Sequence, residues 1–154
     1  PSEQIFVHRN IANMVHSDDA SCMSVIQYAV DQLKVDHIVV CGHSHCGGVR
    51  AVLEEQTSGP IDQWLKPLSV LKTSIAGKLK QASLNERSVT LAELNVVKQV
   101  TNVCKSATVQ TAWEMGEKLS VHGWIFDVST GILKDLLGDI TSARSAAAVK
   151  EQYF

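Results

Sequence analysis

A histidine and a cysteine lie three residues apart in a glycine-rich stretch that follows an apolar run. The stretch is Gly42-His43-Ser44-His45-Cys46-Gly47-Gly48, and Val39-Val40-Cys41 precedes it. Imidazole and thiolate are ligands that zinc favours, and a two-residue spacer is within the range found between paired zinc ligands. If the glycine pair opens a helix, its dipole and unpaired amides favour the thiolate form of Cys46. His43 and Cys46 are therefore candidate zinc ligands.

Other chemistries for this stretch are less consistent with its residues. A Walker A loop ends in Gly-Lys-Ser/Thr, where this chain has Cys46-Gly47-Gly48-Val49, and a dinucleotide fingerprint fails at its second glycine. A hydrolase with Cys46 as nucleophile stays an alternative, although the sequence identifies no third group to orient the histidine. A non-catalytic α/β domain that binds zinc weakly, or serves in subunit interaction, is another, because two ligands rarely define a site.

The elements that must position these residues follow from hydrophobic spacing. We predict a short buried strand over Ile5-Phe6-Val7, a helix over 21–33, a strand over 37–41 and a helix over 47–56. The apolar run over 37–41 is typical of a parallel strand buried on both faces, which makes Cys41 a core thiol. Gly42 is expected to let the chain leave this strand sharply.

The second half of the chain adds further elements. The predicted elements are helices over 61–79, 90–115 and 139–150, a polar loop over 81–86, and strands over 119–128 and 132–134. Together the pattern predicts a single domain over residues 1–154, with a three-layer α/β architecture and a mainly parallel central sheet flanked by helices. The 42–48 loop then lies at the carboxyl end of a strand, where open α/β sheets bind ligands.

Composition limits the possible partners and surroundings. The chain has 154 residues, 45% of them hydrophobic, and a net charge of −2, so neither nucleic acid nor an anionic membrane is an expected partner. No apolar run approaches the roughly 18 residues of a membrane span. Four scattered cysteines predict free thiols in a reducing compartment, most simply the cytoplasm. Because the chain begins with Pro1 rather than Met, an organellar form with a missing targeting segment stays open.

Three motifs occur in a specific order. They are His8-Arg9-Asn10-Ile11-Ala12-Asn13, the 42–48 stretch and Val121-His122-Gly123-Trp124. In this combination the chain resembles the β-class carbonic anhydrases over most of its length. The resemblance implies reversible hydration of CO2 to bicarbonate and a proton, with Zn2+ as cofactor and a homodimer or dimer-based oligomer as assembly.

The resemblance also implies roles for individual residues. His43 and Cys46 are two zinc ligands, and Gly47 and Gly48 shape the loop around the metal. Phe6 and Val7 belong to the strand beside the substrate cleft, and Arg9 is the polar residue that follows it. These assignments are expectations from the family pattern.

One family motif is absent from the sequence. The family places Cys-x-Asp-x-Arg before the His-Arg-Asn segment, and no such motif occurs in these residues. Its cysteine is the third zinc ligand, and its Asp–Arg pair acts at the fourth zinc position. We therefore assign no catalytic residue in this chain and expect the domain to be N-terminally incomplete. The 154 residues alone are expected to hydrate CO2 little faster than buffer.

Overall fold

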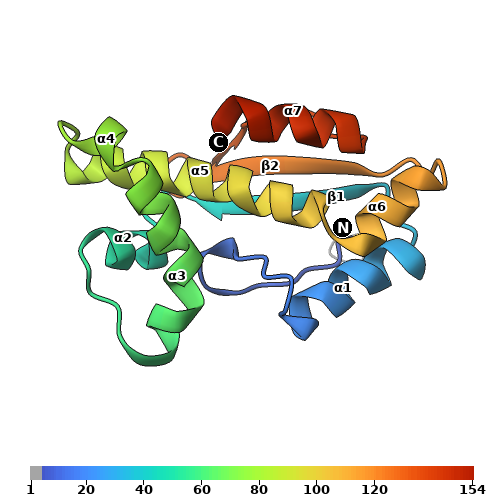
Figure 1. Ribbon diagram of the computed structural model, residues 1–154, viewed down its shortest axis with the longest axis horizontal. Coiled ribbons are helices and arrows are strands. Elements are labelled where there is room, and N and C mark those ends of the chain that lie inside the picture. The colour runs from blue at the N-terminus through green and yellow to red at the C-terminus, as the bar shows by residue number, and fades with distance from the viewer. Residues whose placement is uncertain (1–4) are drawn as a thin grey trace.

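A computed structural model describes residues 5–154, without the side chains of residues 78 and 79. It confirms the α/β class, with helices around a small sheet (Figure 1). In chain order the elements are η2 (Ile11–Asn13), α1 (Ala20–Asp31), β1 (His37–His43), α2 (Gly47–Leu53), α3 (Gly59–Ser74), α4 (Ala76–Leu79), α5 (Leu84–Cys104), α6 (Ala107–Glu114), β2 (Ser120–Asp127), β3 (Ile132–Asp135) and α7 (Ala143–Tyr153).

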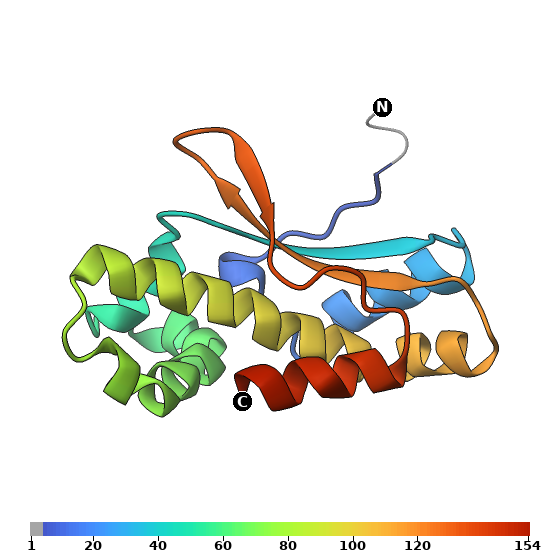
Figure 2. The same ribbon diagram turned by 90° about the horizontal axis from the view of Figure 1, so that it is seen from above.

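The sheet is mixed and has the strand order β1-β2-β3. β1 runs parallel to β2, with His37 opposite Ser120 and His43 opposite Phe126. β3 returns antiparallel to β2, and Figure 2 shows this hairpin projecting away from the helices. The parallel β1–β2 pair places the carboxyl ends of both strands at one edge of the sheet.

The two faces of β1 differ in burial. α5 packs against both β1 and β2, and on this face Val40 and Gly42 are buried. The alternate residues His37, Val39, Cys41 and His43 are exposed. The prediction that this strand is buried on both faces, with Cys41 as a core thiol, is therefore wrong. The described elements cover β1 on the α5 side, and side chains of neighbouring residues in a strand point to opposite faces.

Two predicted helix boundaries are also wrong. The polar residues over 81–86 do not form a loop throughout, because α5 begins at Leu84. Ser83 and Glu86 form a capping box there: the Glu86 amide donates to Ser83 Oγ at 3.3 Å, and the Ser83 amide donates to Glu86 Oε2 at 2.8 Å. The pattern over 90–115 is interrupted after Cys104, and Ser106 caps the separate helix α6.

The residues of the predicted strand over Ile5-Phe6-Val7 form no strand and pair with none among residues 5–154. Their side chains are 69%, 50% and 63% exposed, so the prediction of a buried strand is wrong for the part of the chain that the structure describes. The Phe6 ring instead packs on Tyr28 of α1, with the ring centroids 5.9 Å apart. This contact places the segment against α1.

Buried apolar side chains from the sheet, α1, α2, α3 and α5 form one continuous core. α5 contributes most of its centre, with Leu91, Val96 and Val100 fully buried. None of the helices within residues 5–154 combines the length and the apolar character that crossing a bilayer requires.

Candidate metal centre

Ser44, the first residue after β1, ties this strand to the end of β2. Its amide donates a hydrogen bond to the Phe126 carbonyl at 2.9 Å. Its hydroxyl donates to Asp127 Oδ1 at 3.2 Å and accepts from the Val128 amide at 3.0 Å. Because three hydrogen bonds hold Ser44, the preceding His43 has a fixed place at the carboxyl edge of the sheet.

His43 has an exposed side chain with one ring nitrogen already engaged. Its Nδ1 lies 2.9 Å from the Ser44 carbonyl oxygen. A carbonyl oxygen only accepts, so Nδ1 carries the proton and donates. Nε2 then keeps a free lone pair, as a metal-ligating imidazole requires, and the carbonyl fixes the tautomer.

Cys46 lies three residues further on and is 3% exposed. It is the N-cap residue of α2, and its side chain makes no capping hydrogen bond there. Its sulfur is therefore placed beside the first turn of a helix, where amide dipoles favour a negative charge. Between the two candidate ligands, His45 makes the bend in a left-handed conformation, with φ of 57°.

Gly42 has a different role from the predicted one. β1 continues through Gly42 to His43, so the chain does not leave the strand at this glycine. A Cβ at residue 42 would lie 2.6 Å from Val96 Cγ2 and 3.0 Å from Ile125 Cδ1. Gly42 is required because α5 and β2 approach the strand closely at this point.

The two glycines after Cys46 are not equivalent. A Cβ at Gly48 would lie 3.2 Å from Ile11 Cγ2 and 3.3 Å from Ala12 Cβ. A Cβ at Gly47 would have no neighbour within 4 Å. Close packing of the His-Arg-Asn segment against α2 thus depends on Gly48, while the shaping of a metal-binding loop by both glycines stays a prediction.

Three amide side chains of α5 hold the segment that packs on Gly48. Asn95 Nδ2 donates to the Ala12 carbonyl at 2.8 Å. Gln99 Oε1 accepts from the Val15 amide at 2.9 Å, and Asn102 Nδ2 donates to the Val15 carbonyl at 2.9 Å. Sequence reasoning missed these residues. The sequence does contain a signal for them: three amide residues, spaced four and then three positions apart, lie on one face of the helix among apolar residues.

Phe6, Val7 and Arg9 are the other residues that the family pattern predicts for the substrate pocket. All three are exposed. Over residues 5–154, no hydrogen bond, ion pair or ring contact joins any of them to His43 or Cys46. Their part in a substrate pocket therefore stays a prediction.

The donor set fits zinc, but it is incomplete. A catalytic zinc ion has three protein ligands and an open position, and His43 with Cys46 supplies two. Within the described part of the chain, the only grouping of three or more metal-ligating side chains is His8, Asp19 and Cys22, which excludes both candidates. A zinc site built on His43 and Cys46 would thus need one more protein ligand.

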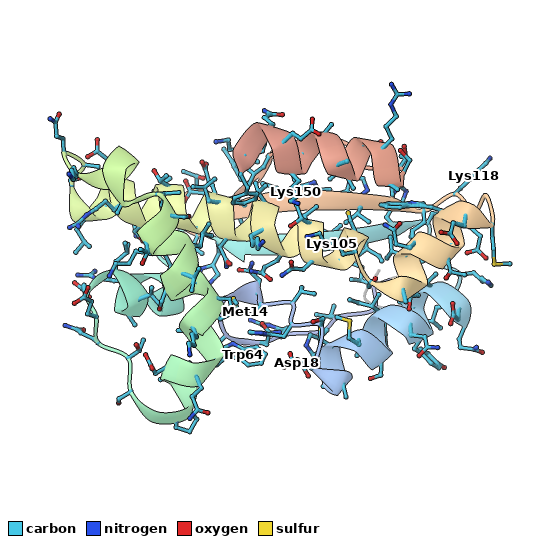
Figure 3. All side chains as sticks on the ribbon, in the orientation of Figure 1. Met14, Asp18, Trp64, Lys105, Lys118 and Lys150 are labelled. Atoms are coloured by element: carbon cyan, nitrogen blue, oxygen red, sulfur yellow. The ribbon has the colours of Figure 1, made fainter. Side chains whose placement is uncertain are left out.

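A partly open cavity of about 270 Å³ lies away from this pair, next to α1 and α5. Its lining includes Met14, Asp18 and Lys105, which are labelled in Figure 3. The ring of His16, another lining residue, packs on Trp64 with centroids 4.5 Å apart. Neither His43 nor Cys46 lines this cavity, so it is no part of the candidate metal centre.

Asp127, Cys104 and Cys22 are among the groups whose pKa values are shifted. The Ser129 hydroxyl and amide lower the pKa of Asp127 to about 2, with smaller help from Thr130 and Ser44. Burial raises the pKa of Cys104 to about 12. Burial, and then the charge of Asp19, raise the pKa of the Cys22 thiol. Cys104 and Cys22 are therefore protonated thiols at neutral pH in the metal-free chain.

Comparison with known proteins agrees with this geometry. A family profile described as "Carbonic anhydrase" matches residues 2–133. A carbonic anhydrase from Emericella nidulans is 46% identical over 134 residues, which are 86% of this chain and 59% of that protein.

Solved structures give the class. A Coccomyxa β-carbonic anhydrase in complex with acetazolamide superposes with a TM-score of 0.88 at 40% identity, covering 96% of this chain and 69% of that one. A tetrameric β-carbonic anhydrase from Sordaria macrospora superposes with a TM-score of 0.82 at 40% identity, covering 88% and 70%. The chain belongs to the β-carbonic anhydrase family. It spans about three-fifths of the length of the Emericella relative.

Proposed function

We propose that this chain is the part of a β-carbonic anhydrase that holds zinc through His43 and Cys46, for the reversible hydration of CO2 to bicarbonate and a proton. The observation that carries the proposal is the hydrogen bond from His43 Nδ1 to the Ser44 carbonyl at 2.9 Å. It leaves Nε2 as the ligating atom, three residues before a buried cysteine at a helix N-terminus. Family membership supplies the reaction.

The chain's own residues orient and restrain the site. Zinc at such a site supplies an activated water near neutral pH. Ser44 fixes the position and tautomer of His43, and burial holds Cys46 against α2. The Asn95 and Gln99 amides keep the Ala12–Val15 backbone in place beside the same helix.

The free edge of β1 is where we propose that the third ligand arrives. β1 pairs with β2 on one side, and no strand among residues 5–154 pairs with its other side. A strand added there in parallel would bring its carboxyl end beside His43, because neighbouring strands lie about 4.8 Å apart. A Cys-x-Asp-x-Arg segment on that strand would supply the missing cysteine and the Asp–Arg pair.

We propose a homodimer, or an oligomer built from dimers, with β2 near the subunit boundary. The hairpin of β2 and β3 exposes Phe126, Val128, Ile132 and Leu133 to between 37% and 64%. Apolar side chains gathered on a projecting hairpin favour burial against another protein surface. The Sordaria relative is tetrameric, and the four free cysteines of this chain favour a reducing compartment such as the cytoplasm.

Zinc analysis of a Cys46→Ser variant tests the metal assignment. A hydroxyl is a far poorer zinc ligand than a thiolate, so the variant should lose the ion held by His43 and Cys46. Cys41→Ser is the matched control, because Cys41 lies in β1, two residues before His43, and is exposed. Unchanged zinc content in Cys46→Ser would refute the assignment.

Stopped-flow measurement of CO2 hydration tests the activity. The 154 residues alone should act little faster than buffer, and an upstream segment with Cys-x-Asp-x-Arg should restore turnover that a chelator abolishes. Full chelator-sensitive activity from the 154 residues would show that the third ligand lies within them. Sedimentation of a folded monomer at micromolar concentration would count against the proposed dimer.

A further inference from the structure

A second set of metal-ligating side chains gathers at the start of α1. One ligand atom each from His8, Asp19 and Cys22 all lie within 4.8 Å of one another. Neither of the ligands proposed for the catalytic zinc belongs to this set. The three residues bring an imidazole nitrogen, a carboxylate oxygen and a sulfur to one point.

The fold holds each of the three in place independently of a metal. Asp19 is the N-cap of α1, where its Oδ1 accepts from the Ser21 amide at 3.0 Å, and Cys22 lies in the first turn of the same helix. Cys22 is 4% exposed. His8 belongs to the segment that Phe6 ties to α1 through its contact with Tyr28.

The three donors face one another without satisfying one another. Within residues 5–154, no hydrogen bond or ion pair joins any two of them. Ligand atoms around a tetrahedral zinc ion lie roughly 3.5 Å apart, given metal–ligand bonds of about 2.0–2.3 Å. No pair in the cluster exceeds this spacing by more than about 1.3 Å, so a small movement of the side chains would let the three atoms surround an ion.

We propose that His8, Asp19 and Cys22 form a second zinc site, separate from the His43–Cys46 centre. A mixed nitrogen, oxygen and sulfur donor set suits zinc and disfavours Ca2+ and Mg2+, which prefer oxygen ligands. Binding displaces the thiol proton of Cys22 to solvent and forms a sulfur–zinc bond, so occupancy rises with pH. The ion joins residue 8 to α1 and so fixes the segment that enters the His-Arg-Asn motif.

Two variants separate ligand loss from helix damage. Asp19→Asn removes the carboxylate but keeps a side chain that caps helices equally well, so the metal-free protein should melt at the same temperature. Cys22→Ser removes the sulfur. Asp18→Asn is the matched control, because Asp18 precedes the cap and does not belong to the cluster.

The measurement is zinc stoichiometry by equilibrium dialysis, with thermal melting at increasing zinc concentration. We expect Asp19→Asn and Cys22→Ser each to lose one equivalent of zinc and the zinc-dependent rise in Tm that this site produces. Asp18→Asn should retain both the equivalent of zinc and the rise in Tm, and Cys46→Ser should retain them too.

Two results would overturn the second site. One is unchanged stoichiometry in Asp19→Asn, which decides the question even if Cys22→Ser fails to fold. The other is loss of all zinc in Cys46→Ser, which would leave the catalytic assignment intact and remove this one.

Discussion

Replacing Gly42 by alanine tests how tightly α5 closes on the strand that carries His43. The new Cβ would lie 2.6 Å from Val96 Cγ2 and 3.0 Å from Ile125 Cδ1. Carbon atoms in favourable contact are about 3.5–4.0 Å apart, so the neighbours must move by roughly 1 Å. Val96 is fully buried and Ile125 is 8% exposed, which leaves neither an open direction.

Overpacking of this kind costs about 1–3 kcal/mol of unfolding free energy. For a domain of this size each kcal/mol corresponds to roughly 2–4 °C in Tm, so Gly42→Ala should lower Tm by roughly 2–12 °C. Calorimetry of the metal-free protein measures the shift. Gly47→Ala is the control, because a Cβ there meets nothing within 4 Å and should stabilise α2 by about 0.5–1 kcal/mol.

A double mutant identifies the clash as the cause. Val96→Ala removes the methyl group that a Cβ at residue 42 would strike, at the cost of a cavity when introduced alone. In the Gly42→Ala/Val96→Ala protein the two changes should compensate, with a coupling of about 0.5–3 kcal/mol. Additive destabilisation, or a Gly42→Ala variant as stable as the parent, would refute the reasoning.

Three further outcomes follow from other parts of the loop and core. His45→Gly should raise Tm by roughly 2–4 °C. The left-handed φ of 57° costs a residue with a side chain about 1–2 kcal/mol, and the greater entropy of glycine in the unfolded chain offsets part of the gain from relieving this strain. Asp127 has its pKa lowered to about 2, so it stabilises the fold above its unfolded pKa near 4 and this contribution is lost as pH falls towards 2. The Tm gap between the parent and Asp127→Asn should therefore narrow as the pH falls from 5 towards 2, and a gap as wide at pH 2 as at pH 7 would contradict this. With iodoacetamide under native conditions, the exposed thiol of Cys41 should react before that of Cys104. Cys104 has a pKa of about 12 and is 1% exposed, so its thiol stays protonated and inaccessible. Mass spectrometry of timed samples measures the order of reaction.

Local patterns in the sequence predicted most of the elements, because spacing reports which residues share a face. α1, β2 and the return strand β3 all lie close to their predicted ranges. The errors in the predicted elements arose where one sequence pattern is compatible with two different structures. An apolar run such as 37–41 occurs in strands buried on both faces, but Val39 and Cys41 are exposed because no described element covers that side.

Helix ends were harder to predict than helix interiors. The apolar spacing continues past Cys104, so periodicity alone joins α5 to α6. What separates them is a capping interaction, in which Ser106 Oγ accepts from the Val109 amide. A serine in this position is common in loops and in helices alike, and its role depends on the backbone angle around it.

The candidate ligand pair could be proposed from the sequence because His43 and Cys46 lie three residues apart in one short stretch. The groups that support it could not, since Asn95 and Gln99 are more than 80 residues from the backbone groups they bind. Such contacts depend on how α5 packs. Amide side chains on the buried face of an apolar helix nevertheless indicate hydrogen-bond partners elsewhere in the chain. Leaving a buried amide without a partner would cost about 1–3 kcal/mol of unfolding free energy.

Two adjacent residues of α5 position the two ends of the stretch that carries His43 and Cys46. Val96 packs against Gly42, one residue before His43, while Asn95 holds the Ala12 carbonyl and Ala12 packs against Gly48, two residues after Cys46. A rotation or shift of this helix therefore moves the strand that ends at His43 and the helix that begins after Cys46 together. Zinc ligands must keep their separation to within a few tenths of an ångström. The zinc affinity that we propose for His43 and Cys46 would thus depend on the packing of a helix that contributes no ligand.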